Sequence, residues 1–171
     1  LPVMGSPSDS VVSPALAVEL GRLGGLGVLH LEGLWTRYAD PEPVLEEIAS
    51  LAPDKATGRM QELYAEPVQP DLVEQRIRDL KAAGITRAVA SPPQRPPALA
   101  PYILKAEPDL LVVQGTVVSA EHVSRGAEPL NLKDFIRHYE IPVVVGGCTS
   151  YQAALHLMRT GAAGVLVGAG S

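Results

Sequence analysis

Residues 141–171 read IPVVVGGCTSYQAALHLMRTGAAGVLVGAGS, and this stretch decides the fold class. The apolar run 143–145 stops at a glycine pair, and a second apolar run, 165–167, stops at the sequence GAGS. Between them, residues 151–160 have the apolar spacing of a helix. Short apolar runs that do not alternate with polar residues indicate strands buried on both faces. The stretch therefore predicts a strand, a helix and a parallel strand, with glycines at the carboxyl end of each strand.

The same unit recurs toward the amino terminus. Continuous apolar runs lie at 28–31, 88–90 and 110–113, and residues 2–4 are a further candidate strand. Helical patterns fill the intervals, and most begin at a capping residue or a proline. The predicted helices are 14–23 after Ser13, 43–51 after Asp40-Pro41, 71–83 with Glu74 and Arg78 paired, 132–140 after Asn131, and 151–160 after Thr149 or Ser150. Residues 53–60 are predicted as a loop, and the proline-rich stretch 92–107 as a short helix at most.

The alternation of strands and helices predicts an α/β protein with right-handed crossovers. At most six strand–helix units can be counted in the 171 residues. A closed (β/α)8 barrel needs eight strands and about 250 residues, whereas a doubly wound sheet of five or six strands fits this length. Composition does not separate the two architectures.

Composition and charge exclude several classes of protein. The chain is 46% hydrophobic and carries a net charge of −5, without a long cluster of Lys or Arg. This argues against nucleic acid and anionic membrane as partners, and no apolar run reaches the ~20 residues of a membrane span. The single Cys148 fits a reducing compartment. The chain opens on Leu1 rather than Met, so we expect an incomplete, cytoplasmic polypeptide whose start lies upstream.

Polar and glycine-rich segments follow the predicted strands. In α/β folds, ligands bind at the carboxyl ends of the strands. Glycines there allow a ligand close to backbone amides, as phosphate sites require, but they equally suit tight turns and helix caps. The segments are 5–10, 30–33, 91–94, 114–116, 146–149 and 168–171.

Five of these six segments lie in stretches that carry a family resemblance. The sequence GSPSDSVVSPALAVELGRLGGLGVLHLEG resembles the first strand–helix–strand unit of the IMP dehydrogenase/GMP reductase family. The stretch 141–171 is similar to that family's later glycine-rich strand ends, and LLVVQGTVVSAEHV matches its fourth strand more weakly. The resemblance implies an incomplete (β/α)8 TIM barrel with strands one to six. Residues 1–171 would form a single partial barrel domain without the regulatory insert that many dehydrogenases carry between strands two and three.

The resemblance also implies roles for individual residues. His30 and Gln114 would lie on the cofactor side, and Gly170 would belong to a monovalent-cation loop. No catalytic residue falls within this chain, because the family's catalytic cysteine would follow Ser171. The implied nucleotide-binding residues are Ser6, Ser8, Gly146, Gly147, Cys148, Gly168, Gly170 and Ser171.

Four positions depart from the family pattern. Ser8 stands for a methionine that packs on the purine, and Cys148 stands for an asparagine. Gln114 replaces an aspartate, and Leu166 replaces a basic residue. The last two changes remove one charge of each sign, which indicates a coherent rearrangement of the site. The aromatic residues Trp35, Tyr38 and Tyr64 could cover a site or an oligomer contact, but an aromatic cluster near a loop favours local packing.

The implied function is a purine nucleotide oxidoreductase with cysteine-mediated chemistry at purine C2. It would use a purine 5′-monophosphate and NAD or NADP, bind a monovalent cation, and assemble as a homotetramer or octamer. IMP oxidation and GMP reduction both stay open, with a lean toward reduction because of Gln114 and Leu166. Two alternatives are a catalytically inactive nucleotide-binding regulatory protein and a flavin-binding barrel enzyme.

Overall fold

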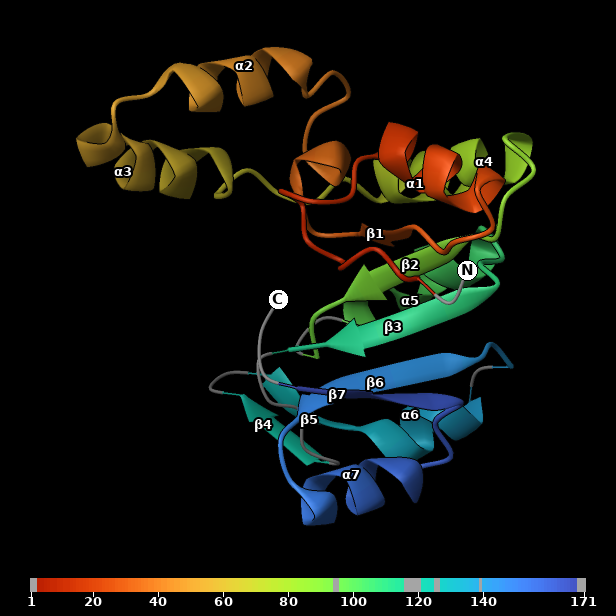
Figure 1. The fold of residues 1–171 in the computed structure, drawn as a ribbon. Coiled ribbons are helices and arrows are strands. Elements are labelled where there is room, and N and C mark those ends of the chain that lie inside the picture. Colours follow the sequence, from red (N-terminus) through yellow and green to blue (C-terminus); the bar gives the residue numbers. More distant parts are fainter. Residues whose placement is uncertain (1–2, 94–95, 116–120, 125–126, 139, 169–171) are drawn as a thin grey trace.

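The protein contains one parallel sheet with helices packed against it (Figure 1). The computed structural model describes residues 3–93, 96–115, 121–124, 127–138 and 140–168. Five strands pair in the order β1-β2-β3-β6-β7, and each pairing is parallel. Their bounds are Val28–His30 (β1), Ala88–Ser91 (β2), Leu110–Gln114 (β3), Val143–Cys148 (β6) and Gly164–Val167 (β7). These strands confirm the α/β class and five of the six predicted strands.

The remaining predicted strand, 2–4, is shorter than expected. Among the described residues it is reduced to one parallel bridge between Met4 and Leu26, just before β1. The amide of Gly5 donates to the carbonyl of Leu26 at 2.8 Å, so the segment still lies along the β1 edge of the sheet. This pairing directs residues 5–9 toward the carboxyl end of β1.

The strands read as continuous apolar runs because both faces of the sheet are covered. One face carries Leu111, Val113, Val143 and Val145, which are buried against the helices. The opposite face carries a separate cluster of smaller side chains around Ala88, Ala90 and Val112, with Val28. In a barrel of this kind, side chains from the strands fill the interior.

The sheet-packing helices begin largely where capping residues predict. Ser13 and Ser150 each accept a hydrogen bond at 3.1 Å from the backbone three residues on, and Asn131 accepts one from the Lys133 amide at 3.1 Å. The predicted Glu74–Arg78 pair is also present, at 2.7 Å. The helices are α1 (Pro14–Arg22), α4 (Pro70–Ala82), α5 (Pro96–Lys105), α6 (Leu132–His138) and α7 (Tyr151–Met158).

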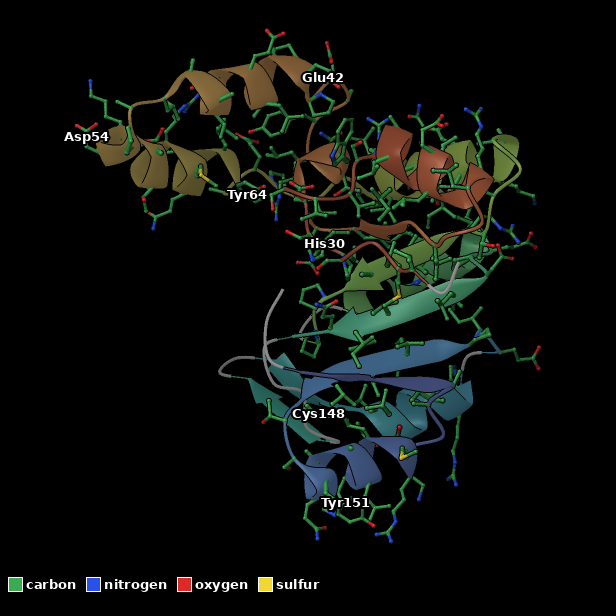
Figure 2. All side chains as sticks on the ribbon, in the orientation of Figure 1. His30, Glu42, Asp54, Tyr64, Cys148 and Tyr151 are labelled. Atoms are coloured by element: carbon green, nitrogen blue, oxygen red, sulfur yellow. The ribbon has the colours of Figure 1, made fainter. Side chains whose placement is uncertain are left out.

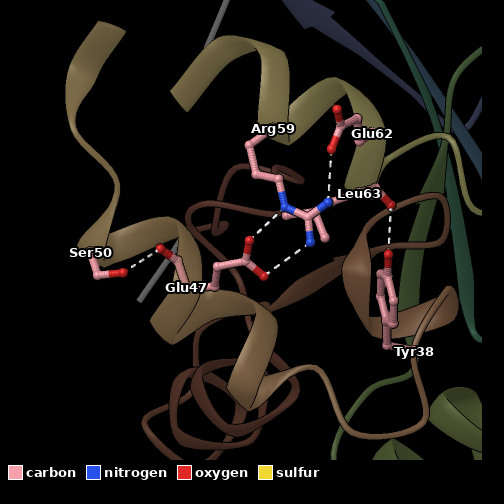
Figure 3. A network of polar contacts seen from close by, with 6 residues as sticks. All are labelled: Tyr38, Glu47, Ser50, Arg59, Glu62 and Leu63. Atoms are coloured by element: carbon pink, nitrogen blue, oxygen red, sulfur yellow. Dashed lines mark hydrogen bonds and ion pairs between the residues drawn. The ribbon is translucent and has the colours of Figure 1, made fainter. Parts of the chain in front are cut away.

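The predicted loop at 53–60 was wrong, because helix α3 spans Pro53–Leu63. It pairs with α2 (Glu42–Ser50), and the pair projects from the body of the molecule (Figure 1). Arg59 of α3 binds Glu47 of α2 at 2.5 Å and Glu62 at 2.8 Å (Figure 3). Proline is tolerated at a helix start, and this tertiary pairing outweighs the helix-breaking Gly58.

Three further local features differ from what the sequence analysis predicts or are missing from it. Asp40 does not cap α2; its cap position is Pro41, which offers no side-chain acceptor. Helix α5 has ten residues and is longer than predicted, since its first prolines occupy the turn that needs no backbone donor and Ala100 and Ile103 are buried. An antiparallel hairpin of β4 (Glu121–Ser124) and β5 (Ala127–Asn131) was not predicted.

Candidate functional site at the carboxyl ends of the strands

Asp9 lies in the loop that follows the parallel bridge between Met4 and Leu26, and its carboxylate holds this loop against other segments. Its Oδ2 accepts hydrogen bonds from the Leu34 amide and from the Tyr64 hydroxyl, each at 2.7 Å. Its Oδ1 lies against Gly33, where an added Cβ would be only 1.9 Å away. Residue 33 must therefore be glycine for the Asp9 carboxylate to take this place. The carboxylate joins three segments that are far apart in the sequence.

His30 ends β1 and faces the same region (Figure 2). Its Nδ1 accepts a hydrogen bond from the Glu32 amide at 3.3 Å, which assigns the proton of the neutral ring to Nε2. Burial lowers the pKa of His30 below 6.5, and the Asp9 carboxylate opposes this shift while Arg37 reinforces it. His30 is accordingly a neutral imidazole near pH 7.

A cavity of about 460 Å³, which we name the central pocket, lies between these residues. Its lining comes from the ends of three adjacent strands and from two loops. It includes Ser8, Asp9, His30, Glu32, Tyr64 and Gln114. The Ser91 hydroxyl, also in the lining, donates to Glu32 Oε1 at 3.3 Å.

Two buried acceptors in the central pocket have no hydrogen-bond partner among the described residues. They are Asp9 Oδ1 and Gln114 Oε1. A buried acceptor without a partner costs about 1–3 kcal/mol, so such atoms indicate a place where a donor binds. The pocket therefore fits a ligand that carries hydroxyl or amide N–H groups.

A second cavity of about 300 Å³, the glycine pocket, adjoins the first. Both pockets are lined by Pro7, Gln114 and Gly115. The glycine pocket adds Ser6, Gly147 and Gly168 with the apolar side chains of Met4, Leu166 and Val167. Strand pairing sets this arrangement, because Gln114 is in register with Gly146 and Gly146 with Leu166.

The predicted site residues divide between the two pockets. Ser8, His30 and Gln114 line the central pocket, while Ser6, Gly147 and Gly168 line the glycine pocket. Gly146 is absent from both linings, but a Cβ there would lie 2.5 Å from that of Leu166, so only glycine lets β6 and β7 approach. Gly170 and Ser171, and with them the predicted cation loop, lie outside the described residues.

The Cys148 side chain does not face either pocket. It is 1% exposed, belongs to the hydrophobic cluster with Leu132 and Leu157, and its thiol donates to the Leu166 carbonyl at 3.5 Å. Figure 2 shows it on the side of β6 toward α7.

Sequence reasoning missed Tyr64 as a site residue. Tyr64 follows α3, 55 positions from its partner Asp9, and burial together with the hydrogen bond to Asp9 raises its pKa above the ordinary value. Its ring lies under the Arg37 guanidinium at 5.8 Å. The available signal was the aromatic group of Trp35, Tyr38 and Tyr64 near a loop, and the pattern alone favoured packing.

No metal cluster or membrane helix is found in the described part of the chain. No group of three or more His, Cys, Asp or Glu side chains is placed to hold a metal ion among the residues the structure describes. Likewise, none of the helices within the described ranges is long and apolar enough to cross a membrane.

Known proteins resemble this chain both in sequence and in fold. A model of the IMP dehydrogenase/GMP reductase domain matches residues 1–171. Proteins named as uncharacterized oxidoreductases in Mycolicibacterium smegmatis and Mycobacterium leprae are 49% and 52% identical over 176 residues, covering all of this chain and 47% of theirs. The crystal structure of an IMP dehydrogenase/GMP reductase-like protein from Corynebacterium glutamicum is 43% identical with a TM-score of 0.91, covering 100% of this chain and 46% of that one.

The parallel sheet and its helices define an incomplete (β/α)8 barrel, and the pockets at its strand ends are the candidate site. This confirms the predicted fold. The chain belongs to the IMP dehydrogenase/GMP reductase family, as the resemblance implied. It spans about half the length of the relatives it matches.

Proposed function

We propose that the whole protein is a purine nucleotide oxidoreductase that acts on a purine 5′-monophosphate with NAD or NADP. When bound, the nicotinamide cofactor supplies or accepts a hydride. Family membership supports the class of oxidoreductase. The proposed reaction proceeds through a cysteine adduct at purine C2, with the cysteine on a loop beyond Ser171. Cys148 is not proposed for this role, because its thiol is buried away from both pockets.

The observation that carries the proposal is the contact between two pockets of different chemistry. The central and glycine pockets share Gln114 and Gly115, so ligands in them would touch. Hydride transfer between two bound rings requires such contact, since the reacting atoms must lie about 3–3.5 Å apart. One site alone would suit a binding protein, whereas adjoining sites suit a two-substrate oxidoreductase.

The glycine pocket fits the purine nucleotide. Gly147 and Gly168 let a phosphate approach backbone amides, and the Ser6 hydroxyl supplies a further donor. The apolar side chains of Met4 and Leu166 suit the faces of a purine ring. Gly170 and Ser171 remain proposed members of this site, and Gly170 of a monovalent-cation loop.

The central pocket fits the nicotinamide end of the cofactor. Ribose hydroxyls and a carboxamide N–H group are donors, and the unpartnered oxygens of Asp9 and Gln114 are acceptors. Neutral His30 adds a ring nitrogen that carries a proton. Because Gln114 and Leu166 both line the glycine pocket, the two departures from the family pattern occur in one place, which supports a coherent rearrangement.

We further propose a cytoplasmic homotetramer or octamer, on the strength of the family resemblance and the single cysteine. Nucleic acid and membrane are not proposed as partners, because the net charge is −5.

A spectrophotometric assay of the full-length protein tests the proposal. IMP with NAD or NADP should produce reduced cofactor, or GMP with NADPH should consume it. Loss of turnover in both directions with tight nucleotide binding would favour the inactive regulatory alternative. A purified protein with a flavin spectrum would favour the flavin alternative.

Two serines of one loop make a matched pair for this assay. Ser6→Ala removes a glycine-pocket hydroxyl, and we expect KM for the nucleotide to rise about tenfold, since a hydrogen bond to a charged group is worth about 1.5–3 kcal/mol. Ser10→Ala is the control, because Ser10 lines neither pocket and bonds only the Ser8 hydroxyl among the described residues. Equal KM values in both variants would contradict the assignment of Ser6.

A further inference from the structure

A third cavity, of about 480 Å³, continues the row of pockets. We name it the arginine pocket, because Arg37 lines it together with Pro67, Val68 and Leu99. It shares Glu32 and Tyr64 with the central pocket, which in turn shares Gln114 with the glycine pocket. Through these shared residues the three cavities adjoin one another, from β7 to the segment that follows α3.

Arg37 is held in a defined orientation beside this cavity. Its Nε donates to the Glu32 carbonyl at 3.2 Å and one Nη donates to the Glu66 carbonyl. Its guanidinium lies 5.8 Å above the centre of the Tyr64 ring. A guanidinium has five N–H groups, and within the described ranges the other three donate to no protein acceptor.

Positively and negatively charged side chains are distributed unevenly among the linings of the three cavities. Among the described residues that line them, Arg37 is the only Lys or Arg. The Glu32 carboxylate accepts from the Ser91 hydroxyl, so it is directed toward β2 and the central pocket. Glu66 is exposed at the rim. Arg37 is therefore the one cationic side chain among these described lining residues with which an anionic group could pair, and Glu32 and Glu66 line the same cavity.

We propose that the arginine pocket binds the nucleotide half of the dinucleotide cofactor, with Arg37 as the donor to its pyrophosphate. This inference rests on the proposed function, which puts the nicotinamide end in the central pocket. The planar fork of a guanidinium binds phosphate oxygens in pairs. The apolar surface of Val68 and Leu99 suits the adenine ring, and Glu66 can accept from ribose hydroxyls.

Equilibrium binding to the full-length protein tests this role separately from turnover. Calorimetry with the intact dinucleotide and with nicotinamide riboside, which lacks phosphates and adenosine, separates the two halves. In Arg37→Gln we expect the Kd of the dinucleotide to rise about tenfold or more, as loss of a charged hydrogen bond implies. The Kd of the riboside should stay within a factor of about two. Arg37→Lys keeps the charge and should recover part of the lost affinity.

Arg76 provides a matched control. It donates to two backbone carbonyls, those of Trp35 and Ala39, each at 2.9 Å, and its guanidinium lies 6.0 Å from the Trp35 ring. It lines none of the three pockets described. Arg76→Gln thus removes similar structural contacts, and both variants are checked for equal thermal unfolding.

Three results would overturn the proposal: an unchanged dinucleotide Kd in Arg37→Gln, an equal loss for dinucleotide and riboside, or the same loss in Arg76→Gln. These results leave the proposed function intact, because the wild-type protein still binds the cofactor. Failure of the wild-type protein to bind either NAD or NADP would instead contradict the proposed function itself.

Discussion

His30 shows how position changes the chemistry of one side chain. The sequence placed it at a strand end, and the structure adds Asp9 and Arg37 as its charged neighbours. Neither neighbour could be inferred from spacing, because Asp9 and Arg37 lie on separate loops that tertiary packing brings to β1. Burial is the largest influence on its pKa and lowers it.

We predict that NMR titration of the folded protein gives His30 a pKa below 6.5. Since the unfolded chain then binds a proton more readily, the contribution of His30 to stability is complete above pH ~6.5 and declines as the pH falls through the folded pKa. Asp9→Asn removes the charge that raises this pKa, so the value should fall further. A His30 pKa above 6.5 in the wild-type protein would contradict the buried, neutral ring described here.

Cys148 contrasts with His30, because its side chain lines neither the central pocket nor the glycine pocket. The resemblance assigned it to the nucleotide site, whereas packing turns its side chain into the helix-facing core. Alternation along β6 alone would point Cys148 away from the face that Val143 and Val145 share, but the register shift between Gly146 and Cys148 brings its side chain onto that face. A glycine-rich strand end gives few side chains from which that alternation could be read.

Among the elements, those stabilised by local chemistry were predicted best. Helices α1, α6 and α7 follow from their capping residues, while α3 was missed because its Pro, Asp and Gly residues resemble a loop. What stabilises α3 is its packing on α2 and the link from the Tyr38 hydroxyl to the Leu63 carbonyl at 3.0 Å (Figure 3). Such contacts depend on the tertiary arrangement and leave no periodic signal.

Glu74 of α4 joins two elements and provides a test. Its carboxylate is 6% exposed and binds Arg78 at 2.7 Å and Lys105 of α5 at 2.9 Å. We predict that Glu74→Gln lowers the free energy of unfolding by about 1–3 kcal/mol, because a buried acceptor loses charged partners. Urea denaturation measures this. Glu19→Gln, which breaks an exposed pair with Arg22, should cost less than about 0.5 kcal/mol.

A smaller loss in Glu74→Gln than in Glu19→Gln would show that the link between α4 and α5 does not stabilise the fold. The sequence supplied the Glu74–Arg78 half of this link through its i,i+4 spacing. Lys105 could not be predicted, since it depends on how α5 packs beside α4.

At the scale of the whole molecule, the five-stranded sheet has two edges, at β1 and β7. Val167 of the β7 edge is 82% exposed, and the apolar side chains of Leu23, Tyr151 and Met158 are 73%, 76% and 63% exposed. Tyr151 lies on the side of α7 that faces away from the sheet (Figure 2). The relatives that the chain matches are about twice as long, whereas these 171 residues are fewer than the about 250 of a closed (β/α)8 barrel. We expect the 171 residues expressed alone to self-associate through these surfaces.

The most direct test is a crystal structure of the full-length protein with purine 5′-monophosphate and cofactor bound. The account predicts the nucleotide in the glycine pocket, with its phosphate near Ser6, Gly147 and Gly168, and the nicotinamide beside His30 and Gln114. A purine nucleotide in the central pocket, or a cofactor that leaves both His30 and Gln114 uncontacted, would contradict it.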